Sequence, residues 1–210
     1  MAFDPNRYLN QESNRYATYL SSLKISKEHL NKTINEAVKN LQDKKAKSFV
    51  IYGEPQSGKT SMMIGLTAKL LDAGYKFIVI LVQDNLNLLE QNFLRFQQST
   101  LSPSPKIFKD ILGPDIKIKD REVVVFCKKN KGDLINLVNK VDNIKNKIII
   151  DDEADFASPN AKINKKNEDG KQIKTAINKE ITDLLGKDGI YIGVTATPIR
   201  IDVNRTFNNE

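Results

Sequence analysis

The sequence has little cysteine and little histidine: its 210 residues include one of each. A single cysteine, Cys127, cannot form a disulfide within the chain, which fits a reducing compartment. It lies in the apolar run VVVFC, so we expect a plain strand cysteine there rather than a nucleophile. His29 falls in the first turn of an expected helix, where an exposed polar side chain is a simpler interpretation than a metal ligand.

Long apolar runs are also missing. No run approaches the roughly 20 residues that a membrane-spanning helix needs. The start, MAFDPNRYLNQESNRY, lacks the basic and then apolar pattern of a secretory signal. We therefore expect a soluble protein of the cytoplasm without a membrane partner. Because 40% of the residues are hydrophobic, the chain can bury one sizeable core, which argues against a wholly disordered chain.

Basic residues outnumber acidic ones, which gives a formal net charge of +7 and a pI near 9.3. A basic chain favours contact with a polyanion, because neutralising phosphates releases counterions. Lysine and asparagine are abundant along the whole chain, however, so the charge can equally be a bias of composition. The charge alone leaves both interpretations open.

From about residue 46, short apolar runs alternate with amphipathic segments. Five runs predict strands: SFVIYG, KFIVILV, REVVVFC, KIIID and GIYIGVTA. The segments between them predict helices at 58–74, 86–99, 131–144 and 174–186. Nearly continuous apolar strands that alternate with helices are typical of a parallel sheet covered on both faces. The predicted fold class is therefore α/β, a doubly wound, mostly parallel sheet.

Three other segments complete the predicted organisation. Residues 26–43 show helical spacing of apolar side chains after a polar start, so we expect a helical extension at 1–45 before a main lobe at 46–210. Proline and glycine punctuate residues 101–115, which predicts a loop with at most one short helical turn. The charged stretch 160–172 predicts a mobile surface excursion.

The stretch GEPQSGKT has the spacing of a phosphate-binding P-loop, and it lies between a predicted strand and a predicted helix. Its glycines let successive backbone N–H groups face an anion at the helix N-terminus. Lys59 would reach the β and γ phosphates, and the Thr60 hydroxyl would bind magnesium. The residues expected to bind nucleotide are Gly53, Glu54, Pro55, Gln56, Ser57, Gly58, Lys59, Thr60 and Ser61.

Four carboxylates follow the apolar run of KIIIDDEAD. In a doubly wound sheet, this places them at the carboxyl edge of the strands, near the P-loop. Side chains alternate along a strand, so only one of Asp151 and Asp152 can face the same metal as the P-loop. Asp152 with Glu153 is the better pair, which leaves Asp151 as a solvated or hydrogen-bonded strand-end acid. Asp151→Asn should then be tolerated, whereas Asp152→Asn should not.

The P-loop, the DEAD stretch at 152–155 and TAT at 195–197 resemble the motifs of superfamily-two helicases and translocases, the DEAD-like nucleic-acid-dependent ATPases. Over residues 48–200 the chain looks most like the ATPase core of the Z-one domain family, known from predicted restriction or anti-phage proteins. The quoted matches are GEPQSGKTSMMIGLTAKLLDAGYKFIVILV, CKKN, IIIDDEADFASPN, TAINKEITDLLG and YIGVTATP.

This resemblance implies a RecA-like lobe that binds ATP and magnesium. It makes Lys59 and Glu153 the catalytic residues, with Glu153 as the base. Thr60 and Asp152 would be the magnesium residues. Asp155 would link to a motif whose members are Thr195 and Thr197, so that nucleotide state is coupled to movement.

A nucleic-acid track is the least defined part of the predicted site. Lys128 and Lys129 end a predicted strand, where they could touch a phosphate backbone or equally be a solvated strand end. Asn130 matches the look of the family, and Asn85 and Gln91 follow a strand where related helicases place backbone-contacting residues. DNA is the favoured nucleic acid over RNA.

The expected function is the ATP-binding motor lobe of a DNA helicase or translocase that serves a restriction or defence protein. The alternative is an ATP-dependent switch or scaffold that recruits a partner without translocation. Only thirteen residues follow Thr197 in the 210-residue sequence (210 − 197 = 13), so we expect a second lobe elsewhere and weak hydrolysis by this segment alone. Tyr16, Tyr19 and Gln42 are the candidates to approach the adenine base.

Overall fold

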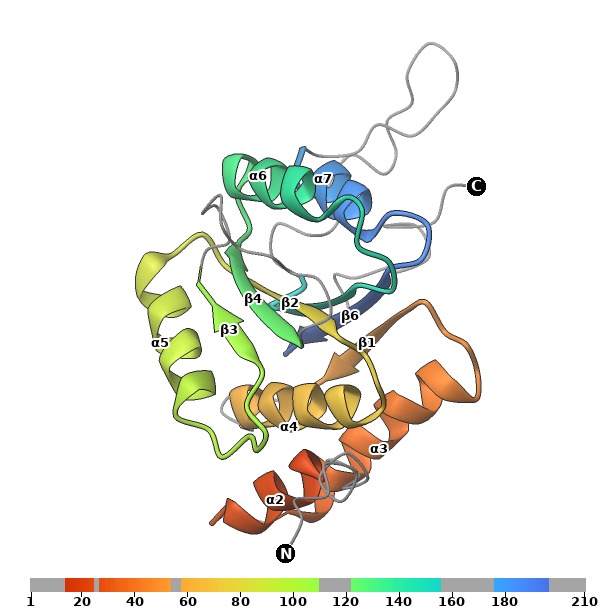
Figure 1. The fold of residues 1–210 in the computed structure, drawn as a ribbon, viewed down its shortest axis with the longest axis vertical. Coiled ribbons are helices and arrows are strands. Elements are labelled where there is room, and N and C mark those ends of the chain that lie inside the picture. The colour runs from red at the N-terminus through yellow and green to blue at the C-terminus, as the bar shows by residue number, and fades with distance from the viewer. Residues whose placement is uncertain (1–13, 25–26, 54–57, 110–121, 156–175, 197–210) are drawn as a thin grey trace, which may run out of the picture.

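A computed structural model describes residues 14–24, 27–53, 58–109, 122–155 and 176–196 (Figure 1). The predicted excursion at 160–172, the P-loop residues Glu54 to Ser57, and Thr197 lie outside these ranges. In the described part of the chain, no helix is both long enough and apolar enough to cross a membrane.

The centre of the molecule is a six-stranded parallel sheet with the order β1-β6-β5-β2-β4-β3. Its strands are β1 (Ser48–Tyr52), β2 (Phe77–Val82), β3 (Lys106–Phe108), β4 (Val123–Lys128), β5 (Ile148–Asp152) and β6 (Ile190–Thr195). The helices are α2 (Arg15–Ser22), α3 (Glu28–Gln42), α4 (Lys59–Asp72), α5 (Leu86–Gln97), α6 (Lys131–Val141) and α7 (Ala176–Leu185). Helices α4, α5, α6 and α7 each fall on a connection between two consecutive strands, as the crossovers of parallel pairing require.

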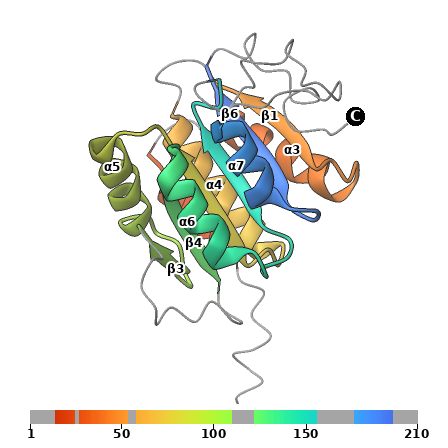
Figure 2. The ribbon, with the colours of Figure 1, turned by 90° about the horizontal axis from the view of Figure 1, so that it is seen from above.

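Helices cover both faces of the sheet (Figures 1 and 2). Buried side chains of α2, α3, α4 and α5 form one hydrophobic cluster with one face, and those of α6 and α7 form a second cluster with the other. This arrangement confirms the predicted doubly wound α/β class.

Strand β2 shows why the apolar runs predicted strands so clearly. Ile78, Ile80 and Val82 belong to the cluster beneath α4, whereas Phe77, Val79 and Leu81 belong to the cluster beneath α6 and α7. None of these six side chains is more than 3% exposed. A central strand buried on both faces has no place for a polar side chain, so its sequence is continuously apolar.

Two elements were not predicted. Helix α2 forms in the polar N-terminal segment, where the Asn14 side chain accepts a hydrogen bond from the Ala17 N–H and so caps the helix. Strand β3 pairs in parallel with β4 inside the segment 101–115, for which a loop was predicted. The strand has only three residues and follows two prolines, which are typical of loops, so the sequence did not predict it.

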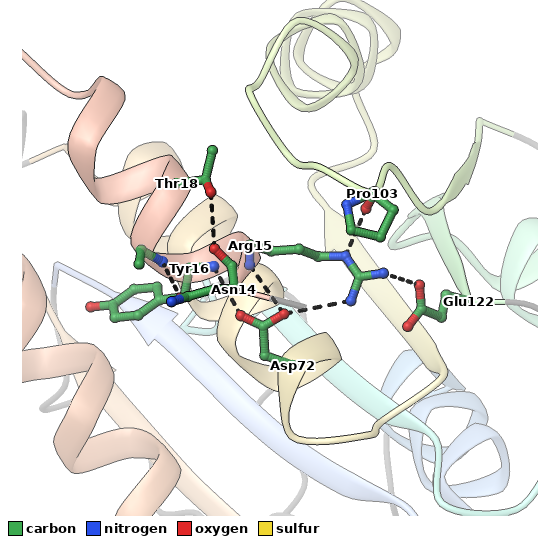
Figure 3. A network of polar contacts seen from close by, with 8 residues as sticks. Asn14, Arg15, Tyr16, Thr18, Asp72, Pro103 and Glu122 are labelled. Carbon is green, nitrogen blue, oxygen red and sulfur yellow. Dashed lines mark hydrogen bonds and ion pairs between the residues drawn. The ribbon is translucent and has the colours of Figure 1, made fainter. Parts of the chain in front are cut away.

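A polar network around Arg15 attaches α2 to the rest of the molecule (Figure 3). The Arg15 side chain is buried, and its guanidinium donates to the Pro103 carbonyl oxygen at 2.6 Å and pairs with Glu122. It also pairs with Asp72, at the end of α4, at 3.5 Å. The same carboxylate accepts the backbone N–H groups of Arg15 and Tyr16. The N-terminal helices therefore pack in one core with α4 and the sheet.

Candidate functional site

The carboxyl edge of the sheet brings the predicted P-loop and acidic residues together. The Gly53 N–H, directly after β1, donates to the Thr195 carbonyl oxygen at 2.9 Å. The Ala154 N–H, in the turn after β5, donates to the Val194 carbonyl oxygen at 3.0 Å. Because β6 lies between β1 and β5, its last two residues hold the start of the P-loop on one side and the acidic turn on the other.

The described part of the P-loop has the backbone that a phosphate cradle needs. Gly58 adopts φ +82°, in the left-handed region, and immediately precedes α4. A residue with a side chain would be strained at this φ, so the backbone conformation explains why glycine occupies this position. No side chain caps the start of α4 among the described residues, which leaves the first N–H groups of the helix for an anion.

Lys59 and Glu153 form the central contact of the site. The Lys59 Nζ lies 2.8 Å from the Glu153 Oε1, and the two side chains are 16% and 35% exposed. Glu153 has φ +55°, which is uncommon for a residue other than glycine. Such strained backbone persists only where the surrounding structure holds it, and it is concentrated at functional sites.

The Thr60 hydroxyl, expected to bind magnesium, contacts two side chains of α5. It donates to the Asn92 Oδ1 at 3.3 Å and accepts a hydrogen bond from the Arg95 guanidinium at 3.3 Å. Sequence reasoning missed both partners. Asn92 is 5% exposed, so a polar residue on the apolar face of an amphipathic helix was the signal that could have found it.

The donor set fits magnesium held together with a triphosphate. The described residues contain no group of three or more His, Cys, Asp or Glu side chains that could hold a metal by itself. Magnesium usually binds through one or two carboxylates together with substrate phosphates and water. A hydroxyl on Thr60 and a carboxylate on Asp152 are oxygen donors of this kind, and Lys59 would supply the positive charge for the phosphates.

Burial, the largest cause, and the neighbouring carboxylates of Glu153 and Asp151 together raise the pKa of Asp152 to about 6, while Lys59 and Lys129 oppose the shift. The folded chain therefore binds this proton more tightly than the unfolded chain does. The resulting stability is fully present below the ordinary pKa of aspartate and is lost as the pH rises through about 6. The buried position of the Asp152 carboxylate therefore lowers the stability of the fold at neutral pH.

This shift predicts a pH-dependent effect of Asp152→Asn, because asparagine mimics the neutral acid. Below about pH 4, we expect the variant and the native chain to have similar free energies of unfolding. Above about pH 6, the variant should be more stable by on the order of 2 kcal/mol. Urea denaturation at pH 4, 5, 6 and 7.5 without magnesium or nucleotide measures this difference. Equal stability of the two proteins at all four pH values would contradict it.

The predicted coupling residues lie together where the structure describes them. The Thr195 hydroxyl donates a hydrogen bond to the Asp155 Oδ1, and Thr195 is fully buried at the end of β6. This joins the acidic turn to the strand whose backbone also holds Gly53. A coupling role for the pair stays a prediction, and Thr197 lies outside the described residues.

The structure corrects the expectations for Asp151 and Lys129. Both side chains are 0% exposed, and the Lys129 Nζ lies 2.9 Å from the Asp151 Oδ1. The Tyr191 hydroxyl donates to the Asp151 Oδ2 at 2.7 Å. Of the two alternatives for Asp151, the solvated acid is therefore wrong and the hydrogen-bonded strand-end acid is confirmed. The two alternatives for Lys129, a solvated strand end and a phosphate contact, both need an exposed ammonium group, so neither fits.

Three of the four remaining nucleic-acid candidates have partners within the chain. Lys128 lies 3.5 Å from Asp84 and 3.4 Å from Asp133. Desolvation is the largest single cause and lowers its pKa, but the two carboxylates together outweigh it, so the pKa is raised above its ordinary value. The side chain of Asn130 caps α6, and that of Asn85 caps α5. Gln91 is exposed on α5. These contacts account for three of the four residues structurally, and a role in nucleic-acid binding stays a prediction.

Two of the adenine candidates are also corrected. Tyr16 and Tyr19 are 9% and 4% exposed, and both belong to the core beneath α4. The Tyr16 hydroxyl donates to Asn31, and burial raises its pKa to about 12. The Tyr19 hydroxyl donates to the Ser61 carbonyl oxygen in the first turn of α4. Neither ring is free to approach a base, whereas Gln42 is exposed.

Comparisons with known proteins bear on the family and the fold. The model of a family described as "Type III restriction enzyme, res subunit" matches residues 23–200. No curated protein matches the sequence.

Among solved structures, the SWI2/SNF2 ATPase core of Sulfolobus solfataricus in complex with dsDNA has a TM-score of 0.50 at 19% identity, over 81% of this chain and 32% of that one. The UvsW helicase of bacteriophage T4 has a TM-score of 0.55 at 15% identity, over 91% and 62%. A further structure of the Sulfolobus ATPase core domain has 0.53 at 16% identity, over 90% and 34%. The chain thus spans less than two thirds of each, and these likenesses show the fold.

Proposed function

We propose that this chain, which belongs to the family of the type III restriction enzyme res subunit, is the ATP-binding motor lobe of a DNA helicase or translocase. The premise is that members of this family are helicase-like ATPase domains of superfamily two. We further propose that it serves a restriction or defence protein of the cytoplasm. The closer resemblance to the Z-one domain family stays a prediction within this proposal.

One contact carries the proposal: the 2.8 Å ion pair between Lys59, at the first position of α4, and Glu153, directly after β5. It brings a phosphate-binding group and a candidate base to one point on the sheet edge. A triphosphate would bring negative charge to Lys59 and release the Glu153 carboxylate to orient the attacking water. Magnesium, when bound by Thr60 and Asp152 through its water shell, would supply charge stabilisation on the phosphates.

The coverage of the solved structures supports a longer protein. Because this chain spans 32% to 62% of them, we propose that it is the first RecA-like lobe, at 46–210 with a helical extension at 1–45, and that a second lobe completes the ATP site. The DNA in one of those complexes makes DNA the proposed partner. Asp155 and Thr195 would transmit the nucleotide state between the acidic turn and β6.

The test is ATP turnover by the full-length protein with and without double-stranded DNA. We expect DNA to stimulate turnover, and Lys59→Ala to lower it by about 10²- to 10³-fold by removing a group that stabilises phosphate charge. The control is Lys76→Ala, because Lys76 is exposed just before β2, at the opposite edge of the sheet. Turnover that DNA leaves unchanged would favour the switch alternative, and full activity of Lys59→Ala would overturn the ATPase assignment.

A further inference from the structure

Lys129 is a buried cation directly behind the acidic turn. It follows β4, its side chain is 0% exposed, and its backbone N–H donates to the Val82 carbonyl oxygen at 2.8 Å. Burying a charged ammonium is costly unless partners surround it, and Lys129 has such partners. Besides the Asp151 carboxylate, its Nζ donates to the carbonyl oxygens of Asp152 at 3.0 Å and Glu153 at 2.8 Å.

These two carbonyl groups flank the Cα of Glu153. The Asp152 carbonyl belongs to the peptide before this Cα, and the Glu153 carbonyl belongs to the peptide after it. Fixing the direction of both peptides fixes the two backbone dihedral angles of Glu153, one of which is the left-handed φ of +55°. One ammonium group therefore holds the residue in a conformation that glutamate alone disfavours.

Further contacts fix both the residue after Glu153 and the ammonium group of Lys129. Ala154 donates its N–H to Val194, so β6 fixes the residue after Glu153. Tyr191 donates to Asp151, and Asp151 in turn orients Lys129. A continuous series of contacts therefore links buried Tyr191, through Asp151 and Lys129, to the backbone of Glu153.

We propose that Lys129 is a positioning residue for ATP hydrolysis, which holds Glu153 in its left-handed conformation so that the carboxylate stands against Lys59. This inference rests on the proposed function for the role of Glu153. It differs from a nucleic-acid contact, because the ammonium group of Lys129 is directed at the backbone of the acidic turn and is closed to solvent.

The chain offers a matched control in Lys147, a second buried lysine. Lys147 directly precedes β5, so it lies at the opposite end of that strand from the acidic turn. It is 4% exposed, and its ammonium group donates to the Val141 carbonyl oxygen. Lys129→Met alone leaves the Asp151 charge unpaired and can fail to fold. The double variant Lys129→Met/Asp151→Asn removes both charges, so it keeps the inference testable.

The experiment compares the double variant with Lys147→Met in the full-length protein, by melting temperature, KM for Mg-ATP and kcat. We expect similar melting temperatures, a KM within about threefold of the native value, and a kcat about 10²-fold lower in the double variant alone, since a small misplacement of a catalytic group has that effect. A folded double variant with the kcat of Lys147→Met would overturn the inference.

A crystal structure of the double variant tests the same inference without turnover. We expect Glu153 to leave the left-handed region and its carboxylate to separate from Lys59. An unchanged Glu153 with the Lys59 contact intact would overturn the positioning role. If the native protein shows no turnover while the double variant shows the displaced turn, the proposed function fails and the positioning of Glu153 by Lys129 stands.

Discussion

Glu153→Gln is expected to stop ATP turnover while the protein still binds Mg-ATP. Glutamine has nearly the same shape and keeps an oxygen that can face Lys59, but it cannot take a proton from the attacking water. Loss of a general base typically lowers kcat by about 10²- to 10⁴-fold. The measurements are kcat and the dissociation constant of Mg-ATP for the full-length protein, and we expect the dissociation constant to change by no more than about threefold.

Glu90→Gln is the matched control for this variant. Glu90 is 38% exposed and pairs with Lys109, so the substitution also removes half of a partly exposed ion pair, here on α5 beside β3. Exposed pairs contribute little to stability, so neither variant should unfold the protein. The proposed role of Glu153 requires kcat to fall in Glu153→Gln and to stay within about twofold in Glu90→Gln. Equal kcat values for the two variants would refute it.

The fold was predictable where burial on both faces leaves one interpretation. The run KFIVILV predicted a strand at 76–82, and β2 spans Phe77–Val82. The helix predicted at 58–74 begins at Lys59 and ends at Asp72. Such elements carry their signal locally, in the period of their apolar residues. The alternation of strands and helices then permits little besides a parallel sheet.

Helix α2 and strand β3 depend on partners that are distant in sequence. Arg15 in α2 contacts residues 57 to 107 positions away, and these contacts bury a side chain that local reasoning places in solvent. Strand β3 exists because β4 pairs with it. No local pattern encodes such partners, so the sequence predicted neither a helix in the polar N-terminal segment nor a strand in the proline-containing segment.

The candidate site divides in the same way. The spacing of GEPQSGKT and the position of Asp152 and Glu153 after an apolar run are local signals, and the structure places Lys59 against Glu153. The buried pairing of Lys129 with Asp151 joins residues 22 positions apart (151 − 129 = 22), one directly after β4 and the other in β5. A charged residue at a strand end is usually solvated, so the sequence alone did not predict a buried ion pair between these two residues. The uncommon state is the informative one here.

Asp151 shows how a correct strand register led to a wrong expectation. Ile148 and Ile150 belong to the cluster beneath α4, and Ile149 belongs to the cluster on the other face with Tyr191. Alternation therefore directs Asp152 toward the side of α4 and Lys59, and Asp151 toward Tyr191, which agrees with the prediction that the two acids face opposite sides of the sheet. The wrong parts were the solvated alternative and the expectation that Asp151→Asn is tolerated, because the face away from the P-loop is as deeply buried as the face toward α4.

Asp151→Asn is therefore expected to destabilise the fold by about 3–5 kcal/mol, because it leaves the buried ammonium of Lys129 without its counter-charge. For a chain of this size, this corresponds to a melting temperature lower by roughly 6–20 °C. Urea denaturation at pH 7.5 measures the loss. The control is Asp183→Asn, whose pair with Lys179 at 3.8 Å joins side chains 46% and 66% exposed and should contribute less than about 0.5 kcal/mol.

The double variant Lys129→Met/Asp151→Asn separates the charge from the packing. If the loss in Asp151→Asn comes from an unpaired buried charge, removing that charge should restore most of the stability, since neutral replacement of a buried pair is often nearly neutral. An Asp151→Asn variant as stable as Asp183→Asn would contradict the buried pair. Full stability of the double variant together with a low kcat would mean that the Lys129–Asp151 pair is retained for the geometry of Glu153 rather than for the stability of the fold.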